Sequence, residues 1–246
     1  MTDALALVTG TSRGIGPAIA SELLERGWEV LGVARGRAGV EHPRYRHLAV
    51  DLADAESVEG VFTELAERGL FDERQRIGLV NNAAVLDIEP AVDFDLAGLV
   101  HSATLNLAVP AWLSGWVLRT APRTAALRIV NLSSGAAHGP YPAWGSYCAT
   151  KAALRMVDQV LALELEEYEQ HAGRDAAVVT YAPGVVATAM QEQIRGSDPS
   201  RFPRRDKFVA LHEEGQLAEP SGPAREIADI LESDPPQVWT ERRFGG

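Results

Sequence analysis

The stretch ALALVTGTSRGIG, residues 4–16, decides the fold. It begins with a short apolar run without charge, which is typical of a buried parallel strand. A glycine-rich turn follows at once, and apolar residues then recur at helical spacing as far as Gly27, a typical helix stop. Such a turn lets a phosphate approach the backbone, where the helix N-terminus offers free N–H groups and a positive dipole. The stretch therefore predicts a nucleotide site; the alternative is a glycine-rich turn without a ligand.

Strand and helix patterns alternate along the rest of the chain, which favours an α/β fold with a Rossmann-like, doubly wound parallel sheet. We expect a single domain over residues 1–246, because no repeat or low-complexity linker interrupts the pattern. Helical patterns lie at 53–68, 96–118, 147–168 and 223–232. Further strands are expected at 28–34, 46–50, 77–80, 126–132, 176–181 and 237–240.

Segment 185–219 breaks this alternation. It carries two prolines and a cluster of basic residues, with a short helix expected around residues 208–211. A long excursion directly after a strand end is often a lid over the ligand site. We expect a substrate lid here; the alternative is a simple surface insertion.

Polar and glycine residues gather where the expected strands end. Ligands of doubly wound sheets bind beyond the carboxyl ends of the strands. The residues that fall there are Gly10, Arg35, Asp51, Asn81, Ser134 and Gly184. Their shared location predicts one site.

Tyr147 and Lys151 are one helical turn apart, so the phenol and the ammonium share a helix face. A neighbouring lysine favours the phenolate and makes the phenol a better acid. Ser134 lies before them at the end of a strand, where its hydroxyl could hold a carbonyl oxygen. The combination predicts proton transfer to a carbonyl while hydride reaches its carbon. The alternatives for the separate residues are that Tyr147 and Lys151 are a surface pair and that Ser134 is a helix cap.

The end of the second strand indicates which dinucleotide binds. In this fold class a carboxylate near that end binds the ribose 2′-hydroxyl of NAD. Here the strand ends in Ala34, Arg35, Gly36 and Arg37, without an acid. A guanidinium pairs with a 2′-phosphate, and Arg13 could reach the same group. We therefore expect NADP(H); the alternative is that Arg35 and Arg37 are solvated loop charges.

Bulk properties narrow the class of protein. The 246 residues are 46% hydrophobic and 23% charged, as in ordinary globular domains. The net charge of −11 disfavours nucleic acid and anionic membranes as partners. The single cysteine, Cys148, excludes an internal disulfide framework. No signal peptide and no apolar run of membrane-spanning length stand out, so we expect a cytoplasmic protein with no membrane partner, and we assign no metal ligands.

Together these motifs resemble the classical short-chain dehydrogenase/reductase family over nearly the whole chain. Ser134, Tyr147 and Lys151 match its catalytic serine, tyrosine and lysine, and Asn106 matches its fourth catalytic residue, which supports a water relay behind the lysine. Within the family, residues 182–191 and the segment from Phe208 to Leu217 resemble the sepiapterin reductase and benzil reductase branch.

The resemblance also implies the cofactor-binding residues. Asp51 would bind the adenine amino group, although it could instead cap the following helix. Thr188 would bind the nicotinamide carboxamide, although a helix could instead begin near Met190. The implied set is Gly10, Ser12, Arg13, Gly14, Ile15, Gly16, Arg35, Asp51, Leu52, Asn82, Ala83, Pro183, Gly184, Val186 and Thr188.

The expected activity is NADPH-dependent reduction of a ketone or diketone, a small-molecule carbonyl substrate. Alternatives are NAD(P)-dependent alcohol oxidation and a non-catalytic nucleotide-binding protein on the same fold. The helices that carry Asn106 and Tyr147 are more apolar than one core stripe needs, which predicts a homodimer or homotetramer as in the family, or else deeper burial. The candidate substrate residues are His138, Tyr141, Trp144, Val185 and Met190.

Overall fold

The computed structural model describes residues 3–235 and 237–246. Within these residues the chain forms a seven-stranded sheet in the order β3-β2-β1-β4-β5-β6-β7, and every neighbouring pair is parallel. This confirms the predicted doubly wound sheet. The strands are β1 (Ala4–Thr9), β2 (Glu29–Ala34), β3 (Tyr45–Ala49), β4 (Arg76–Asn81), β5 (Ala126–Leu132), β6 (Ala176–Ala182) and β7 (Trp239–Arg243).

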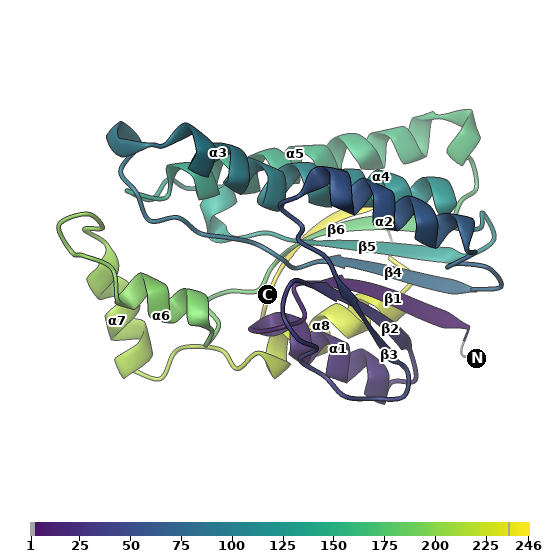
Figure 1. Cartoon of the computed structure of the whole chain (residues 1–246), viewed down its shortest axis with the longest axis horizontal. Coiled ribbons are helices and arrows are strands. Elements are labelled where there is room, and N and C mark those ends of the chain that lie inside the picture. Colours follow the sequence, from purple (N-terminus) through teal and green to yellow (C-terminus); the bar gives the residue numbers. More distant parts are fainter. Residues whose placement is uncertain (1–2, 236) are drawn as a thin grey trace.

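Helices cover both faces of the sheet (Figure 1). Two of them, α1 and α8, pack together on one face, while α2, α4 and α5 cover the other (Figure 1). The helices are α1 (Ile15–Glu25), α2 (Ala55–Glu67), α3 (Leu96–Ala103), α4 (Val109–Thr120), α5 (Gly145–Glu167), α6 (Ala189–Arg195), α7 (Arg205–Glu213) and α8 (Ser221–Glu232). Shorter 3₁₀ turns are Ala91–Asp93, Gly135–Ala137 and Glu169–His171.

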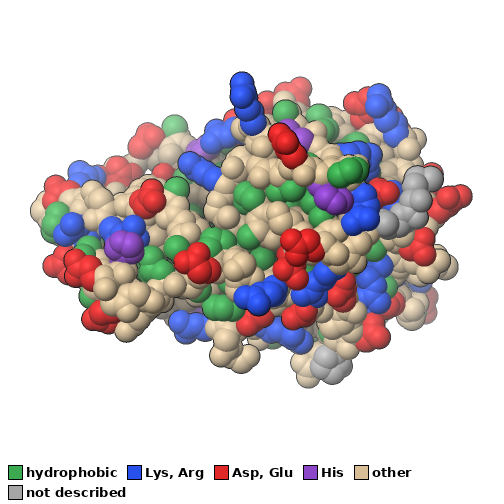
Figure 2. Space-filling view, turned by 90° about the horizontal axis from the view of Figure 1, so that it is seen from below, with side chains coloured by type: hydrophobic (Ala, Val, Ile, Leu, Met, Phe, Trp, Pro, Cys, Tyr) green, Lys and Arg blue, Asp and Glu red, His purple; other side chains and the backbone are tan. Residues whose placement is uncertain are grey.

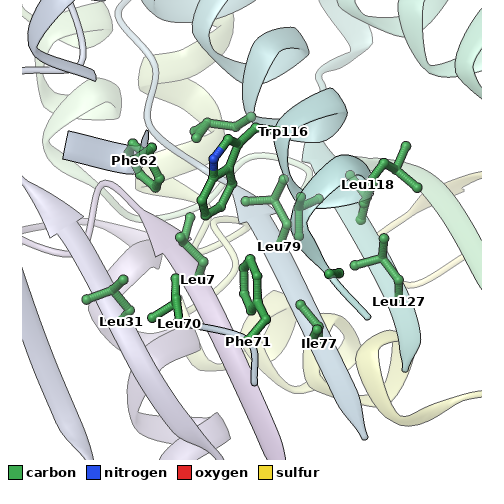
Figure 3. Close-up of a cluster of buried hydrophobic side chains, with 14 of the residues drawn as sticks. Leu7, Leu31, Phe62, Leu70, Phe71, Ile77, Leu79, Trp116, Leu118 and Leu127 are labelled. Carbon is green, nitrogen blue, oxygen red and sulfur yellow. The ribbon is translucent and has the colours of Figure 1, made fainter. Parts of the chain in front are cut away.

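The core on the α2–α4 side is built around aromatic rings (Figure 3). Phe62 on α2 meets Trp116 on α4 edge-on, with ring centroids 5.0 Å apart, and Phe71 packs 5.4 Å from the same indole. Leu7 and Leu79 from β1 and β4 are fully buried beneath them. Edge-to-face aromatic pairs add to the stabilisation from burial alone, so these contacts fix α2 and α4 on the sheet.

The helix that begins at Leu96 is continuous as far as Thr120, because a π-helical turn at Thr104–Ala108 joins α3 to α4. Its 25 residues are long and apolar enough to span a membrane by length and composition, since an 18-residue window has a mean hydropathy of 1.3. The prediction that no apolar run reaches that length was therefore wrong. In the structure, Leu113 and Trp116 of this helix lie in the core, which accounts for part of the apolar content.

Segment 185–219 folds into α6 and α7, which project beyond the end of the sheet (Figure 1). An isolated bridge between Val186 and Ala218 closes the base of this lobe. The short helix expected at 208–211 is confirmed within α7, whereas the pattern did not predict α6 as a separate helix.

Candidate active site

The glycine turn after β1 has a backbone that only glycine adopts easily. Gly10 and Gly14 have φ angles of +74° and +71°. A Cβ atom on Gly16 would lie 2.1 Å from the Gly10 carbonyl oxygen, so α1 can begin this close to β1 only with glycine there. The turn thus points the first N–H groups of α1 into the space beyond the strand.

A cavity of about 470 Å³ opens at this turn and runs along the carboxyl ends of the strands. The predicted residues that line it share this edge of the sheet. They are Gly10, Ser12, Arg13, Gly14, Ile15, Arg35, Asp51, Leu52, Asn82, Ala83, Tyr147, Lys151, Pro183, Thr188 and Met190.

Arg35 and Asp51 lie together at one end of the cavity. The Arg35 guanidinium is 3.5 Å from the Asp51 carboxylate, and both side chains are largely exposed. Asp51 accepts a hydrogen bond from the Ala53 amide at 3.0 Å, while Asp54 caps α2 by accepting one from Ser57 at 3.1 Å. The residue that caps α2 is therefore Asp54 and not Asp51, and Asp51 lines the cavity.

Tyr147 and Lys151 lie at the other end of the cavity, on the first two turns of α5. Both are buried, and the Lys151 Nζ is 5.7 Å from the centre of the phenol ring. The ammonium donates a hydrogen bond of 2.7 Å to the Leu132 carbonyl at the end of β5. The predicted pair therefore shares one face of the helix and is fixed to the sheet.

Burial is the largest influence on the pKa values of Tyr147 and Lys151. It raises the pKa of Tyr147 to about 12, and interaction with the Ser134 hydroxyl lowers it in part. Burial lowers the pKa of Lys151 to about 8, and the nearby Asp158 carboxylate acts in the opposite direction. Near neutral pH the phenol is protonated and the lysine is charged, which suits a proton donor beside a cation.

Two serines end β5 beside Tyr147. Ser134 interacts with the phenol, and its Oγ also accepts a hydrogen bond of 3.2 Å from the Ala136 amide. Ser133 lines the cavity, and its Oγ is buried without a hydrogen-bond partner among residues 3–235 and 237–246. A buried hydroxyl of this kind is available to a bound molecule.

Asn106 is fully buried in the π-helical turn, where its side chain holds the chain after β4. Its Oδ1 accepts from the Val85 amide and its Nδ2 donates to the Val85 carbonyl, each at 2.9 Å. Its Nδ2 also lies 3.3 Å from the Thr150 hydroxyl, one residue before Lys151. Asn106 therefore lies behind the lysine and does not line the cavity.

On the α6 side, Thr188 ends the loop after β6, and the helix begins at Ala189, with Met190 as its second residue. Thr188 is the N-cap residue, and its side chain makes no capping hydrogen bond, so it faces the cavity and begins the helix at once. Gly184 and Val186 lie between Pro183 and Thr188 in the chain but do not line the cavity, and Gly16 lies behind the turn.

An aromatic cluster surrounds Tyr147. Trp144 meets the Tyr147 ring edge-on at 6.0 Å and stacks on Tyr141 at 4.7 Å and on Phe202 at 5.3 Å. Val185 and Met190 pack against the same cluster. The structure thus gathers these four candidate substrate residues near the phenol, whereas His138 pairs with Glu241 at 2.5 Å on β7 and is about half exposed.

Several lining residues were not predicted. Leu86, His101, Leu105 and Gln193 border the cavity near Tyr147. Gln193 donates a hydrogen bond of 2.9 Å to the Leu86 carbonyl and so ties α6 to the chain after β4. His101 and Leu105 are four residues apart, and this spacing could have placed both on the same face of the expected helix. Gln193 could not be predicted, because it lies on α6, a helix that the sequence pattern did not indicate.

The cavity suits a dinucleotide. The positive-φ glycines and the start of α1 offer backbone N–H groups to a diphosphate, and a Cβ atom on Gly14 would approach only Thr188, at 3.6 Å, across this space. The orphaned Ser133 hydroxyl and the Lys151 ammonium lie toward the other end. The charged and hydrogen-bonding groups are therefore spaced along a long cleft rather than gathered at one point.

Comparison with known proteins gives a consistent result. A family model described as short chain dehydrogenase matches residues 4–198. The chain is 34% identical over 241 residues to a benzil reductase ((S)-benzoin forming) of Bacillus cereus, covering 93% of this chain and 94% of that protein. It is 31% identical over 252 residues to the sepiapterin reductase of Mus musculus, covering 94% and 92%. A solved short-chain dehydrogenase/reductase of Saccharomyces cerevisiae, 28% identical, matches with a TM-score of 0.84 over 99% of this chain and 96% of that one.

Proposed function

The chain belongs to the short-chain dehydrogenase family and is an oxidoreductase, and from this premise we propose that it catalyses NADPH-dependent reduction of a ketone or diketone to an alcohol. The observation that carries the proposal is the placement of Tyr147 and Lys151 in the same cavity as the glycine turn and Arg35. A proton donor at one end and a phosphate-binding turn at the other are the two ends of a hydride-transfer site.

Tyr147 is the general acid in this proposal. A reduced nicotinamide bound in the cavity would supply the hydride to the carbonyl carbon. The Tyr147 hydroxyl donates its proton to the carbonyl oxygen, which completes the alcohol and leaves a phenolate. Lys151 stabilises that phenolate, and Ser134 donates a hydrogen bond that holds the carbonyl oxygen. Asn106 supports the lysine from behind through Thr150.

Arg35 supports the choice of NADPH. Its guanidinium is exposed at the cavity end opposite Tyr147, and Ser12 and Arg13 of the glycine turn line the same cavity. Two arginines there favour a 2′-phosphate. In this proposal Asp51, the ion-pair partner of Arg35, binds the adenine amino group.

The walls near Tyr147 support a neutral, apolar carbonyl substrate. Leu86, Leu105 and Met190 line this end. Among the lining residues of the described part of the chain, Asp51 is the only carboxylate, and it lies at the other end. An aromatic diketone fits this chemistry better than a charged substrate does.

The lobe of α6 and α7 acts as the substrate lid in this proposal. It is tied to the body by Gln193 and by an ion pair of 3.3 Å between Arg201 and Asp93. Seen from below, hydrophobic side chains gather between this lobe and the rest of the molecule (Figure 2). The lobe also packs on the body through one small aromatic cluster, in which Phe202 and Phe208 contact Trp144, so in this proposal the lid opens by parting that cluster.

A panel of carbonyl compounds tests the proposal. NADPH absorbance would be followed with benzil, with a pteridine that carries a diketone side chain, and with simple aliphatic ketones. We expect NADPH consumption with at least one aromatic diketone and slower consumption of NADH. No turnover with any carbonyl, or a clear preference for NADH, would contradict the proposal. We also propose a cytoplasmic location and a homodimer or homotetramer.

A further inference from the structure

A buried carboxylate lies behind the proposed proton donor. Asp158 is fully buried on α5, two helical turns after Lys151 and on the same face. Its Oδ1 accepts a hydrogen bond of 2.5 Å from Asn131 Nδ2, and its Oδ2 accepts one of 2.6 Å from the Thr180 hydroxyl. A buried carboxylate costs free energy unless it is hydrogen-bonded or paired with a charge, and these two hydrogen bonds hold Asp158 in its buried position.

The partners of Asp158 form a row across the sheet. Asn81, Asn131 and Thr180 are at the same level on β4, β5 and β6, because Asn81 is in register with Asn131 and Asn131 with Thr180. Asn81 donates to Asn131 at 2.7 Å, and the Trp239 indole donates to Thr180 at 3.1 Å. The row is next to the cavity along β5, because Leu132 and Ser133, which follow Asn131 in the chain, line the cavity.

Two routes connect Asp158 with Lys151. The first is through space, because the charges of Asp158 and Lys151 interact. The second is through β5: Asp158 holds the Asn131 side chain, and the next carbonyl, that of Leu132, accepts the hydrogen bond from the Lys151 ammonium. The carboxylate can therefore influence both the charge and the position of the ammonium.

We propose that Asp158 is a positioning residue for the reaction: its buried carboxylate keeps the Lys151 ammonium charged beside Tyr147 and fixes the β5 carbonyl that binds it. The proposal rests on the proposed function, in which Tyr147 and Lys151 transfer the proton. Asp158 acts through Lys151 and does not touch the cavity.

The surrounding groups leave Asp158 as the anion that acts on Lys151. Arg155 on the same helix also interacts with Asp158, and it is paired with Glu241 of β7 at 2.9 Å. The other titratable groups nearby are Tyr147, the neighbouring Cys148 thiol that interacts with it and, on α3 at the cavity wall, His101. Neutral groups come from the remaining elements packed around the pair, namely Asn81 (β4), Asn131 (β5), Thr180 (β6), Ser114 (α4) and Asn106 in the π turn.

The titration of these groups defines a pH window. Burial raises the pKa of Asp158 to about 7, against the hydrogen bonds from Thr180 and Asn131 and the charge of Lys151. The carboxyl is therefore neutral well below pH 7 and charged above it, while the pKa of Lys151 is lowered by burial to about 8. Removal of the carboxylate charge makes the first proton leave the Tyr147–Lys151 pair at lower pH, whichever of the two groups loses it.

The test is the pH profile of kcat/KM for carbonyl reduction in the Asp158→Asn variant of the full chain. Asparagine keeps the shape and can accept from Asn131, so the charge is the main change. We expect the ratio of kcat/KM in the variant to that in the wild type to be near one at pH 6 and to fall about tenfold by pH 8.5. The reason is that the alkaline limb of the pH profile shifts to lower pH by on the order of one unit. A ratio that is the same at every pH would overturn the proposal, whether activity is lower or unchanged.

Two further variants keep the test decisive if Asp158→Asn folds poorly. Thr180→Val keeps the carboxylate but removes a hydrogen bond, so the pKa of Asp158 rises and the ratio should dip between pH 7 and 8 and recover above. Ser114→Ala removes a neutral hydroxyl on α4 that contacts Asn81 of the polar row at 3.4 Å, and it should leave the profile unchanged. A dip in both variants, or in neither, would overturn the proposal. Activity that survives Tyr147→Phe would instead overturn the proposed function, which separates the two failures.

Discussion

Arg35 is the residue whose side chain most directly favours one dinucleotide over the other. It is exposed, and Asp51 is its ion-pair partner at 3.5 Å. Exposed ion pairs of this kind are weak, so the guanidinium can turn toward a phosphate at little cost. This single side chain separates the proposed NADPH preference from the NAD-linked alternative.

Arg35→Asp should therefore weaken NADPH binding and leave NADH binding nearly unchanged. A charge-assisted hydrogen bond to a phosphate contributes about 1.5–3 kcal/mol, so we expect the Kd for NADPH to rise by roughly tenfold to a hundredfold. Fluorescence titration with both cofactors measures the effect. Arg68→Asp, at an exposed position after α2, is the matched control. An unchanged ratio of NADPH to NADH affinity would show that Arg35 does not select the cofactor.

Residues at strand ends were the most predictable part of the site. Gly10, Arg35, Tyr147 and Lys151 follow from strand–turn–helix patterns and one-turn spacing, and the structure brings them to one cavity. His138 was not predictable in this way, because its loop could turn toward either Tyr147 or β7 and the pairing with Glu241 depends on tertiary structure.

At the scale of elements, the lobe of α6 and α7 is connected to the site through aromatic rings. Phe202 lies between the two helices, is fully buried and stacks on Trp144, which contacts Tyr147. The lobe has little of the backbone pairing that holds the sheet, with one isolated bridge at its base. Its position over Tyr147 therefore depends on a few side chains.

Phe202→Ala should raise the KM for the carbonyl by about tenfold and leave the Kd for NADPH within about twofold, because the ring seats the lid and does not line the nucleotide end. Deletion of a buried ring typically costs about 3–5 kcal/mol of stability. Phe62→Ala, at an equally buried ring in the α2–α4 core, controls for that loss. A similar KM change in both variants would mean that residues 185–219 are not a lid.

Element boundaries were predictable where periodicity was strong. β5 was expected at residues 126–132 and begins and ends there, and α5 begins two residues before Tyr147. The π turn at Thr104–Ala108 and the helix α6 were not predicted. A π turn has no distinct hydrophobic period, and α6 has only seven residues, too few for a helical repeat to stand out.

At the scale of the whole molecule, one face remains apolar in the single chain. Leu96 and Val100 on α3, with Met156, Val160 and Leu163 on α5, are 46–75% exposed. The two helices contact one another. The sequence predicted a surplus of apolar residues on the helices that carry Asn106 and Tyr147, explained by a subunit interface or by deeper burial. Deeper burial accounts for Val109, Leu113, Trp116 and Leu154, whereas the exposure of Val160 and the other four side chains favours the interface.

Val160→Glu should shift the protein toward the monomer, since a carboxylate at the centre of a paired apolar surface would be desolvated without a partner. Light scattering coupled to size-exclusion chromatography measures the mass. Thr63→Glu, at an exposed position on α2, is the control. A wild-type protein that is already monomeric would show that this face does not pair two copies of the chain.

The central claim is that Tyr147 donates the proton in a carbonyl reduction, and single-turnover kinetics of Tyr147→Phe test it most directly. The variant keeps the ring and its contact with Trp144 and removes the hydroxyl. We expect NADPH binding within about twofold of wild type and a rate of NADPH oxidation by benzil, or by the best carbonyl of the panel, that is lower by about 10²–10⁴. A Tyr147→Phe variant that reduces the carbonyl at the wild-type rate would contradict the account.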